Sequence, residues 1–264
     1  MHAIVTGGTS GIGLALVRRL AGRGDRVSVL ALDDADLAAL RASPDPWAAG
    51  LHLAPVDVSD REAVARATHG AEEAHGPADL LVTCAGIVTP GRFWELADAE
   101  FERHMAVNYF GTVWSVRAVV PGMIQRRSGS IAMISSFAGL LGVYGYGAYS
   151  PSKFAVRGLA ETLRMELKPH GVHVAGVYPS DVDTPMLAAE NKLKPPETFA
   201  VSGTAKMQTA DQVVDAILRG IDRRQATILC DRSSAVLAGL VGAAPWAARL
   251  ITDRAVAGAN PNRP

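Results

Sequence analysis

The chain has little of what marks a nucleic-acid-binding, metal-binding or disulfide-stabilised protein. Its 26 basic and 26 acidic residues cancel, so no excess of positive charge is available to bind DNA or RNA. It contains only two cysteines, Cys84 and Cys230, and no Cys or His residues at metal-ligand spacing. We therefore expect no metal ion and no nucleic-acid partner. No apolar leader precedes the first predicted strand, so we expect a cytoplasmic protein with reduced thiols.

Long apolar runs are also scarce, with one exception near the C-terminus. Residues 235–251 (AVLAGLVGAAPWAARLI) are apolar but contain Pro245 and Arg249. The run is shorter than the roughly 20 residues that a spanning helix needs. Packing against the core or a partner subunit is the simpler interpretation. Weak association with a membrane surface, or lining of the substrate entrance, is the alternative.

What the chain does have is a regular alternation of strand-like and helical segments. Several of the strands are continuous apolar runs, as is typical of a sheet covered on both faces. Right-handed crossovers then predict a single α/β domain over 1–264, with an open, doubly wound parallel sheet of about seven strands. The predicted strands lie within 2–6, 26–32, 50–58, 79–86, 130–136, 172–179 and 226–230, and the helices cover 14–22, 37–42, 61–75, 99–126, 149–168 and 211–222.

A glycine-rich loop, TGGTSGIG, follows the first predicted strand at residues 6–13. Its glycines suit a turn in which the backbone approaches a pyrophosphate at a helix N-terminus. A tight turn that only needs positive φ is the alternative. We predict a dinucleotide site here, with contacts from Gly7, Thr9, Ser10, Gly11, Ile12 and Gly13.

The end of the second predicted strand bears on which dinucleotide binds. In the usual scheme an acidic residue there binds the ribose hydroxyls, and a basic residue binds the 2′-phosphate of NADP. This chain has Leu32 and Asp33 with no adjacent cation, and carboxylates would repel a 2′-phosphate. The residues therefore favour NAD(H) over NADP(H). Capping of the next helix by Asp33 is the alternative interpretation.

Two later strand ends carry residues that suit a flat cofactor. An aspartate after the third strand can accept a hydrogen bond from an adenine amino group, and the valine beside it can pack on the ring. Capping of the next helix by the two residues that follow is compatible with this. Small residues after the fourth strand leave room for a ring. The predicted contacts are Asp57, Val58, Cys84, Ala85 and Gly86.

Four polar residues are predicted to border one cleft. Lys153 follows Tyr149 by four residues, so both lie on one face of a helix. Ser136 ends a strand 13 residues before Tyr149. Asn108 lies in a helical stretch, where asparagine is unfavourable.

In order and spacing, the glycine loop, the strand-end residues and these four polar residues resemble the short-chain dehydrogenase/reductase family over almost the entire chain. The resemblance implies a Rossmann-type fold, an enzyme, and hydride transfer between a nicotinamide and an alcohol or ketone. It further implies nicotinamide contacts from the segment YPSDVDTP. A proline-bounded turn with a threonine cap is the alternative there. The residues concerned are Pro179, Asp181, Val182 and Thr184.

The chemistry accounts for the four residue types. An ammonium beside a phenol favours the phenolate, so Lys153 is expected to lower the pKa of Tyr149 and also to bind the nicotinamide ribose. Tyr149 then acts as general acid in reduction and as base in oxidation. Ser136 is expected to hydrogen-bond the substrate oxygen. Asn108 is expected to hold a water that links Lys153 to solvent.

Three longer segments resemble the 3-ketodihydrosphingosine reductases of sphingolipid synthesis: NYFGTVWSVRAVVPGM, AYSPSKFAVRGLAETLRMELKPHGVHV and YPSDVDTPMLAAENKLKPPET. This resemblance implies NADPH and a long-chain amino ketone, although Leu32 stands where their pattern has an Arg. We hypothesise that Asp181 or Asp183 pairs with the substrate ammonium; turn formation or capping is the alternative. An apolar pocket is expected from Val88, Phe93, Leu141, Val143, Tyr144 and Met186.

Other functions stay open. Another apolar ketone or alcohol, of steroid, polyketide or fatty-acyl type, is the alternative substrate. A cofactor-binding regulatory protein is disfavoured, because all four polar residues are intact. We expect residues 1–190 to form the cofactor-binding and catalytic core and 185–264 to cover the substrate. The resemblance implies a homodimer or homotetramer.

Overall fold

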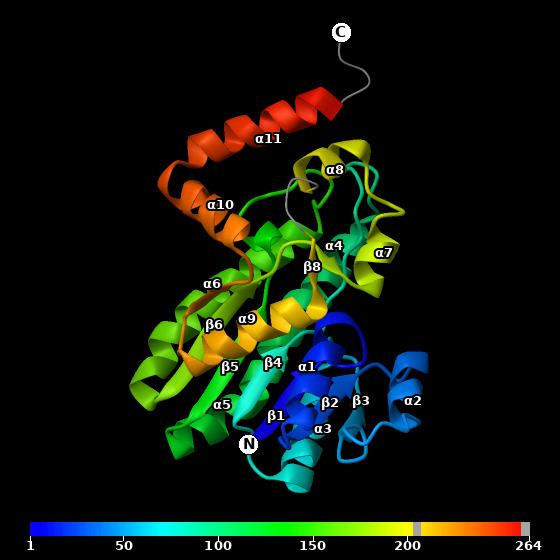
Figure 1. Cartoon of the computed structure of the whole chain (residues 1–264), viewed down its shortest axis with the longest axis vertical. Coiled ribbons are helices and arrows are strands. Elements are labelled where there is room, and N and C mark those ends of the chain that lie inside the picture. The colour runs from blue at the N-terminus through cyan, green and yellow to red at the C-terminus, as the bar shows by residue number, and fades with distance from the viewer. Residues whose placement is uncertain (203–206, 260–264) are drawn as a thin grey trace.

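The computed structural model describes residues 1–202 and 207–259, which are built around a seven-stranded parallel sheet (Figure 1). The strand order is β3-β2-β1-β4-β5-β6-β9. The chain therefore proceeds outward from β1 in one direction and returns to β4 to proceed in the other. In such sheets the crevice at this reversal, outside the carboxyl ends of the strands, is the usual ligand site. The strands are β1 (His2–Thr6), β2 (Arg26–Ala31), β3 (His52–Pro55), β4 (Leu80–Thr83), β5 (Gly129–Ile134), β6 (Val172–Tyr178) and β9 (Thr227–Leu229).

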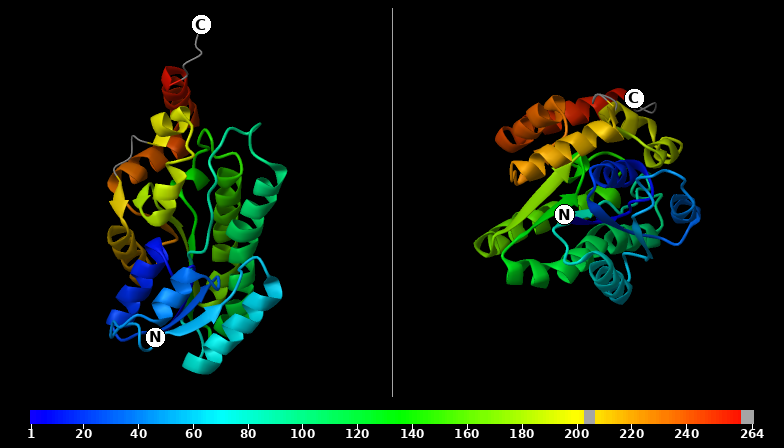
Figure 2. Two further views of the ribbon diagram at one scale, coloured as in Figure 1. Left: turned by 90° about the vertical axis from the view of Figure 1, so that its right-hand side faces the viewer. Right: turned by 60° about the horizontal axis from the view of Figure 1, so that its bottom comes forward.

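Helices cover both faces of the sheet, as Figure 2 shows from two further directions. Successive strand residues point to opposite faces. Within β1, Ala3 and Val5 join the apolar core on one face, and Ile4 joins the core on the other. The first face is covered by α1 (Gly11–Gly22), α2 (Ala35–Arg41) and α9 (Ala210–Asp222), and the second by α3 (Arg61–His75), α5 (Gly111–Arg126) and α6 (Tyr149–Leu167). The predicted doubly wound α/β fold is confirmed.

The predicted helix over 99–126 is in fact three consecutive segments. α4 (Asp98–His104) leads into a π-helical turn (Met105–Phe110) and then into α5. Single π-turns inside α-helices are often found at functional sites. Asn108 lies in this irregular turn. Asparagine is unfavourable inside a regular α-helix, so its position in the π-helical turn accounts for its presence here.

A group of elements lies beyond the carboxyl ends of the strands, at the top of Figure 1. It comprises β7 (Val182–Asp183), α7 (Pro185–Glu190), α8 (Pro196–Ser202), β8 (Gln208–Thr209), α10 (Arg232–Ala243) and α11 (Pro245–Ala259), together with a 3-10 turn at Phe137–Gly139. α11 packs on α8 and α10. The sequence analysis predicted none of these helices or strands: most are too short to show a periodic pattern, and it treated α10 and the start of α11 as one apolar run. A second 3-10 turn, Lys168–His170, lies between α6 and β6.

Among the described residues, no single helix has the length and apolar composition to cross a bilayer. Only together do α10 and α11 have that length and apolar composition, and the pair is bent by 117°.

Candidate active site

A cavity of about 480 Å³ lies at the carboxyl ends of the parallel strands. Its walls come from the segments that follow β1 through β6, together with α7, α8, α10 and α11. The predicted loop residues at 7 and 9–13 all line it. The cavity therefore runs from the glycine loop, past the ends of the strands, to the first turn of α6.

The glycine loop is shaped so that side chains would not fit. Gly7 has a φ of +64°, and a Cβ there would lie 2.7 Å from the backbone of Ala85. A Cβ on Gly13 would lie 2.1 Å from the carbonyl oxygen of Gly7. Ser10 stands at the N-cap of α1 and makes no side-chain cap hydrogen bond. The N-terminal amides of α1 thus remain available to an anion, so the loop fits the pyrophosphate of a dinucleotide.

At the end of β2 one predicted contact is wrong. Leu32 lines the cavity, but the carboxylates in its wall are Asp34 and Asp36 rather than Asp33, which is exposed outside it. Asp34 has an extended backbone, and neighbouring residues of an extended chain point to opposite sides. The cap of α2 is also Asp34, whose Oδ1 accepts hydrogen bonds from the N–H groups of Asp36 and Leu37, both at 3.1 Å.

The remaining predicted strand-end residues lie in the cavity wall: Asp57, Val58, Cys84, Ala85 and Gly86. Asp57 Oδ1 accepts hydrogen bonds from the backbone and hydroxyl of Ser59, at 2.9 and 2.8 Å. Capping of α3 is done by Asp60. Burial raises the pKa of the Cys84 thiol to about 12, so it contributes a neutral surface.

Tyr149, Lys153 and Ser136 meet at the far end of the cavity, and all three line it. Tyr149 opens α6, and Lys153 follows one turn later with its Nζ 5.6 Å from the centre of the Tyr149 ring. Lys153 Nζ donates a hydrogen bond to the carbonyl oxygen of Ile134 at 3.1 Å. Ser136, just past β5, hydrogen-bonds with the Tyr149 side chain. The structure therefore brings Ser136, at the end of a strand, next to the two residues that share the first turns of α6.

The expected lowering of the Tyr149 pKa is wrong. Burial raises the pKa of Tyr149, the carboxylates of Glu190 and Asp181 raise it further, and the Ser136 hydrogen bond acts in the opposite direction. Burial also lowers the pKa of Lys153 to about 8. At neutral pH the phenol is therefore protonated and the amine mostly charged. This is the state from which a proton can be donated to a ketone oxygen.

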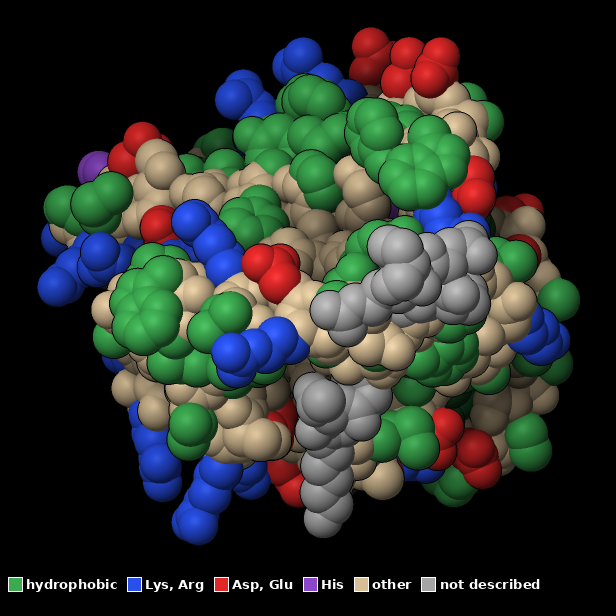
Figure 3. Space-filling model, turned by 90° about the horizontal axis from the view of Figure 1, so that it is seen from above, with side chains coloured by type: hydrophobic (Ala, Val, Ile, Leu, Met, Phe, Trp, Pro, Cys, Tyr) green, Lys and Arg blue, Asp and Glu red, His purple; other side chains and the backbone are tan. Residues whose placement is uncertain are grey.

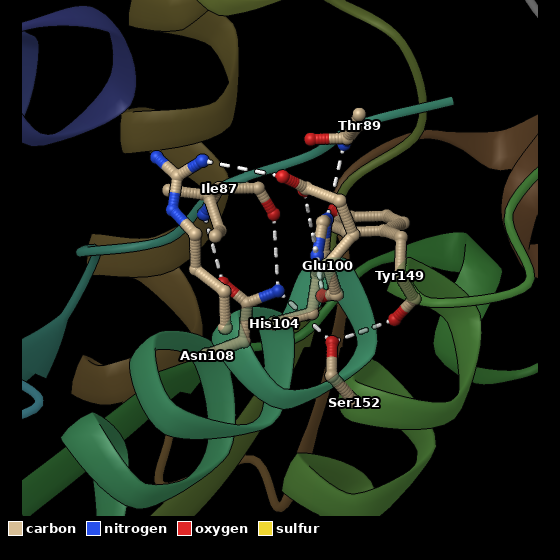
Figure 4. A network of polar contacts seen from close by, with 8 residues as sticks. Ile87, Thr89, Glu100, His104, Asn108, Tyr149 and Ser152 are labelled. Atoms are coloured by element: carbon tan, nitrogen blue, oxygen red, sulfur yellow. Dashed lines mark hydrogen bonds and ion pairs between the residues drawn. The ribbon is translucent and has the colours of Figure 1, made fainter. Parts of the chain in front are cut away.

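Asn108 is outside the cavity wall and is 1% exposed. Figure 4 shows its polar contacts. Its side chain accepts from the N–H of Ile87 at 2.8 Å and donates to the carbonyl of Ile87 at 3.0 Å. Its Nδ2 also donates to Ser152 Oγ at 2.9 Å, and that hydroxyl donates to the carbonyl of Tyr149 at 2.7 Å. Asn108 thus ties the segment after β4 to the first turn of α6. Its predicted water contact stays a prediction.

Gly86 lets Asn108 and Lys153 converge. A Cβ on Gly86 would lie 3.1 Å from Asn108 Oδ1 and 3.3 Å from Lys153 Nζ. The absence of a side chain therefore keeps these two polar groups next to the floor on which a nicotinamide would lie.

His104 is a site residue that the sequence analysis missed. It is fully buried, and its ring lies edge-on to Tyr149 at 6.5 Å. Nδ1 donates to the carbonyl of Glu100 at 2.6 Å, and Nε2 accepts from the N–H of Thr89 at 3.0 Å. Both contacts require the neutral imidazole, and burial lowers the pKa of His104. No local signal could have shown this, since a lone histidine in a helix is usually exposed.

A pH dependence of stability follows from His104. Its pKa is lower in the folded than in the unfolded chain, so its contribution is complete above the unfolded value of 6.5 and is lost as the pH falls below it. We expect His104→Gln, whose amide can keep both contacts without titrating, to lose less stability between neutral and mildly acidic pH than the wild type. Denaturant unfolding at several pH values measures this. His69→Gln is the control, because His69 is 75% exposed. Equal pH slopes in all three proteins would contradict the assignment.

The substrate side of the cavity is mostly apolar, and three of the six residues predicted to line it do so. Leu141, Val143 and Met186 line it. The other three, Val88, Phe93 and Tyr144, do not line it. Phe93 is 67% exposed, and its ring packs against Phe101. The Tyr144 side chain hydrogen-bonds with Arg92. Tyr146, two residues after Tyr144, lines the cavity and was not among the predicted residues. The other apolar wall residues here are Leu187, Ala200, Val201, Leu237, Ala248, Ile251 and Ala255.

The segment after β6 contributes as predicted. Pro179, Asp181, Val182 and Thr184 line the cavity. Thr184 Oγ1 also accepts from the N–H of Leu187 at 3.3 Å, so it caps α7 as well. Asp183 is exposed and outside the cavity wall, so the hypothesis that it meets the substrate is wrong for this residue.

Comparison with known proteins agrees with this geometry. The profile of the short chain dehydrogenases matches residues 1–195. The chain belongs to the short-chain dehydrogenase family. It is 41% identical over 223 residues to 3-dehydrosphinganine reductase of Danio rerio, covering 83% of this chain and 67% of that one. It is 43% identical over 225 residues, with the same coverage, to 3-ketodihydrosphingosine reductase of Mus musculus.

Two solved structures have the same fold as this chain. ElxO with NADP bound superposes with a TM-score of 0.78 at 21% identity, covering 87% of this chain and 96% of that one. The 3-oxoacyl-[acyl-carrier protein] reductase from Brucella melitensis has a TM-score of 0.74 at 27% identity, covering 86% and 88%. The protein is thus an NAD(P)-dependent oxidoreductase that interconverts C=O and CH–OH groups, with a nicotinamide cofactor.

Proposed function

We propose that this enzyme reduces the ketone of 3-ketosphinganine, a long-chain 2-amino ketone, to the secondary alcohol. The observation that carries the proposal is the position of Tyr149: its phenol lies in a cavity that continues into apolar walls from α7, α8, α10 and α11. An alkyl chain can extend along those walls while its ketone meets the phenol. The names of the relatives at 41–43% identity support the same substrate.

The residues divide the work as follows. Ser136 and Tyr149 hydrogen-bond the ketone oxygen, which holds the carbonyl in place and stabilises the negative charge that develops on it. The nicotinamide, when bound, supplies the hydride to the carbonyl carbon. Tyr149 donates the proton to the oxygen. The ammonium of Lys153 then stabilises the phenolate that is left behind.

For the cofactor we infer a preference for NAD(H). A 2′-phosphate needs a cation or free N–H groups, and the wall at the end of β2 offers Leu32, Asp34 and Asp36. The N–H groups at the start of α2 are already bonded to the carboxylate of Asp34. The NADP bound to ElxO is the opposing observation.

A second candidate substrate is a 3-oxoacyl thioester. It is favoured by the similarity to the Brucella melitensis reductase, whose name gives that substrate. The same phenol and the same apolar walls would serve it. The two candidates differ in the amine, which only the sphingoid ketone carries.

The test is a side-by-side assay of 3-ketosphinganine, a 3-oxoacyl thioester and a plain long-chain ketone, each with NADH and with NADPH. We expect kcat/KM to be highest for 3-ketosphinganine, by about 10-fold or more. We also expect NADH to be the better reductant. No turnover of 3-ketosphinganine would refute the substrate proposal, and a preference for NADPH would refute the cofactor proposal, each independently of the other.

The cellular location and the oligomeric state stay predictions. In the view onto the C-terminal helices, hydrophobic side chains form several patches among charged ones (Figure 3). Val236 and Trp246 are 75% and 70% exposed, whereas Leu237 and Ala248 line the cavity. This division supports the alternative interpretation that 235–251 lines the substrate entrance, and it leaves apolar side chains for a membrane surface or a second subunit.

A further inference from the structure

A cluster of four polar side chains lies beside Tyr149, and no step of the mechanism uses it. Glu190 ends α7, Lys194 follows it by one helical turn, Asp181 follows β6, and Tyr146 precedes α6. Glu190 Oε1 accepts hydrogen bonds from Lys194 Nζ at 2.8 Å and from the hydroxyl of Tyr146. Lys194 Nζ also lies 3.9 Å from Asp181 Oδ2. Three members, Tyr146, Asp181 and Glu190, line the cavity, whereas the Lys194 side chain is only 1% exposed.

The charges of this cluster do not balance. Two carboxylates face a single ammonium, which leaves one negative charge in excess. Burial of an incompletely paired carboxylate is costly. The same charge opposes the reaction, because Glu190 and Asp181 both raise the pKa of Tyr149 and thereby disfavour the phenolate that proton donation leaves. A cation bound at the cluster would relieve both costs.

The geometry leaves a place for that cation. Both donors on Glu190 bond to Oε1, and among the described residues no hydrogen bond to Oε2 is found. The Tyr146 ring lies 5.4 Å from the Tyr149 ring, so the cluster is next to the position of the reacting ketone. In the substrate of the proposed function, the ammonium sits on the carbon adjacent to the ketone.

We infer that Glu190 and Asp181 bind the ammonium of a 2-amino ketone, with Tyr146 and Lys194 orienting the Glu190 carboxylate. This inference rests on the proposed function and names the residues that distinguish its substrate from a plain ketone. It replaces Asp183 of the earlier hypothesis with Glu190, which the sequence analysis did not single out. The signal that could have identified it is the four-residue spacing of Glu190 and Lys194 after a predicted cofactor segment.

The turnover test compares a long-chain 2-amino-3-ketone with the matching ketone that lacks the amine. Glu190→Gln keeps an acceptor for Tyr146 and Lys194 but removes the charge. We expect it to lower the ratio of kcat/KM values, amino ketone over plain ketone, about 10- to 100-fold. Loss of a carboxylate near Tyr149 should raise the turnover of the plain ketone. Asp181→Asn is the second variant and should lower the ratio in the same direction.

Matched controls carry the same changes outside the cavity wall. They are Glu166→Gln on the exposed face of α6 and Asp183→Asn at an exposed position of β7, two residues from Asp181. Both should keep the wild-type ratio. Equal losses for both substrates in Glu190→Gln and Asp181→Asn would mean that the cluster only holds α7 in place, and would overturn the inference. An unchanged ratio in both would overturn it as well.

A binding test separates this inference from the proposed function. Calorimetry with a long-chain 2-amino alcohol and the matching alcohol, in the presence of cofactor, needs no turnover. The wild type should bind the amino alcohol more tightly, and Glu190→Gln should abolish most of that difference. If 3-ketosphinganine is not reduced but the binding difference is present, the proposed function fails and the inference stands. If the wild type binds both alcohols equally, the inference fails whatever the turnover.

Discussion

Tyr149→Phe is expected to reduce ketones about 10²- to 10⁴-fold more slowly than the wild type, which is the usual contribution of a positioned general acid. The substitution removes only the hydroxyl, so the ring keeps its contacts with Tyr146 and His104. Because burial keeps the Tyr149 phenol protonated at neutral pH, this hydroxyl holds the proton that the ketone oxygen needs. Single-turnover measurement of cofactor oxidation isolates the chemical step.

Cofactor binding is the readout that distinguishes a catalytic from a structural role. We expect the fluorescence titration of Tyr149→Phe with reduced cofactor to stay close to that of the wild type. Tyr109→Phe is the matched control, since Tyr109 lies in the π-helical turn but outside the cavity wall, and its turnover should be unchanged. A Tyr149→Phe enzyme that retained turnover within a few-fold would show that another group donates the proton.

Gly13→Ala should weaken cofactor binding more than any other single-methyl change in the loop. Its Cβ would lie 2.1 Å from the Gly7 carbonyl oxygen and 2.9 Å from the Gly7 carbonyl carbon, both backbone atoms that cannot rotate away. The loop must shift, and overpacking of this kind costs about 1–3 kcal/mol or more. Where this cost destabilises the cofactor-bound conformation of the loop, the affinity for the cofactor drops about 10- to 100-fold. Titration of cofactor fluorescence and thermal unfolding measure the two effects.

Gly70→Ala is the control for the loop variant. Gly70 lies inside α3, and a Cβ there meets no atom within 4 Å. Alanine is favoured over glycine in a helix by about 0.5–1 kcal/mol, so this variant should be slightly more stable and bind cofactor normally. Normal cofactor affinity in Gly13→Ala would show that the loop accommodates the methyl group and is not held as tightly as its geometry indicates.

The elements that the sequence predicted correctly are those whose signal is local. Tyr149 and Lys153 share a helix face because of a four-residue spacing, and the glycine loop follows from the residues that its own turn requires. The seven parallel strands were recognisable because each is a short segment rich in apolar and β-branched residues between helical segments. In each case the information lies within a few consecutive residues, which is why no other part of the chain was needed.

The errors have a different origin. Asp33 was preferred to Asp34 because the spacing cannot show which neighbour of an extended pair faces inward. Tyr144 was predicted to line the apolar pocket and does not, because its side chain hydrogen-bonds with Arg92 from another loop, a contact that the local sequence does not show. The short helices α7 and α8 and the β7–β8 pair carry no periodicity long enough to read.

The amino-acid order alone thus predicted the fold and the reaction type, and it singled out Tyr149 as the candidate proton donor. The electrostatic state of that tyrosine depended on the folded chain, because burial and two carboxylates from other segments raise its pKa, against the effect of the Ser136 hydrogen bond. The walls that meet the substrate depended on it too, since they combine α7, α8, α10 and α11 with strand ends more than one hundred residues earlier. Desolvation and long-range charge are properties of packing, and a spacing pattern does not contain them.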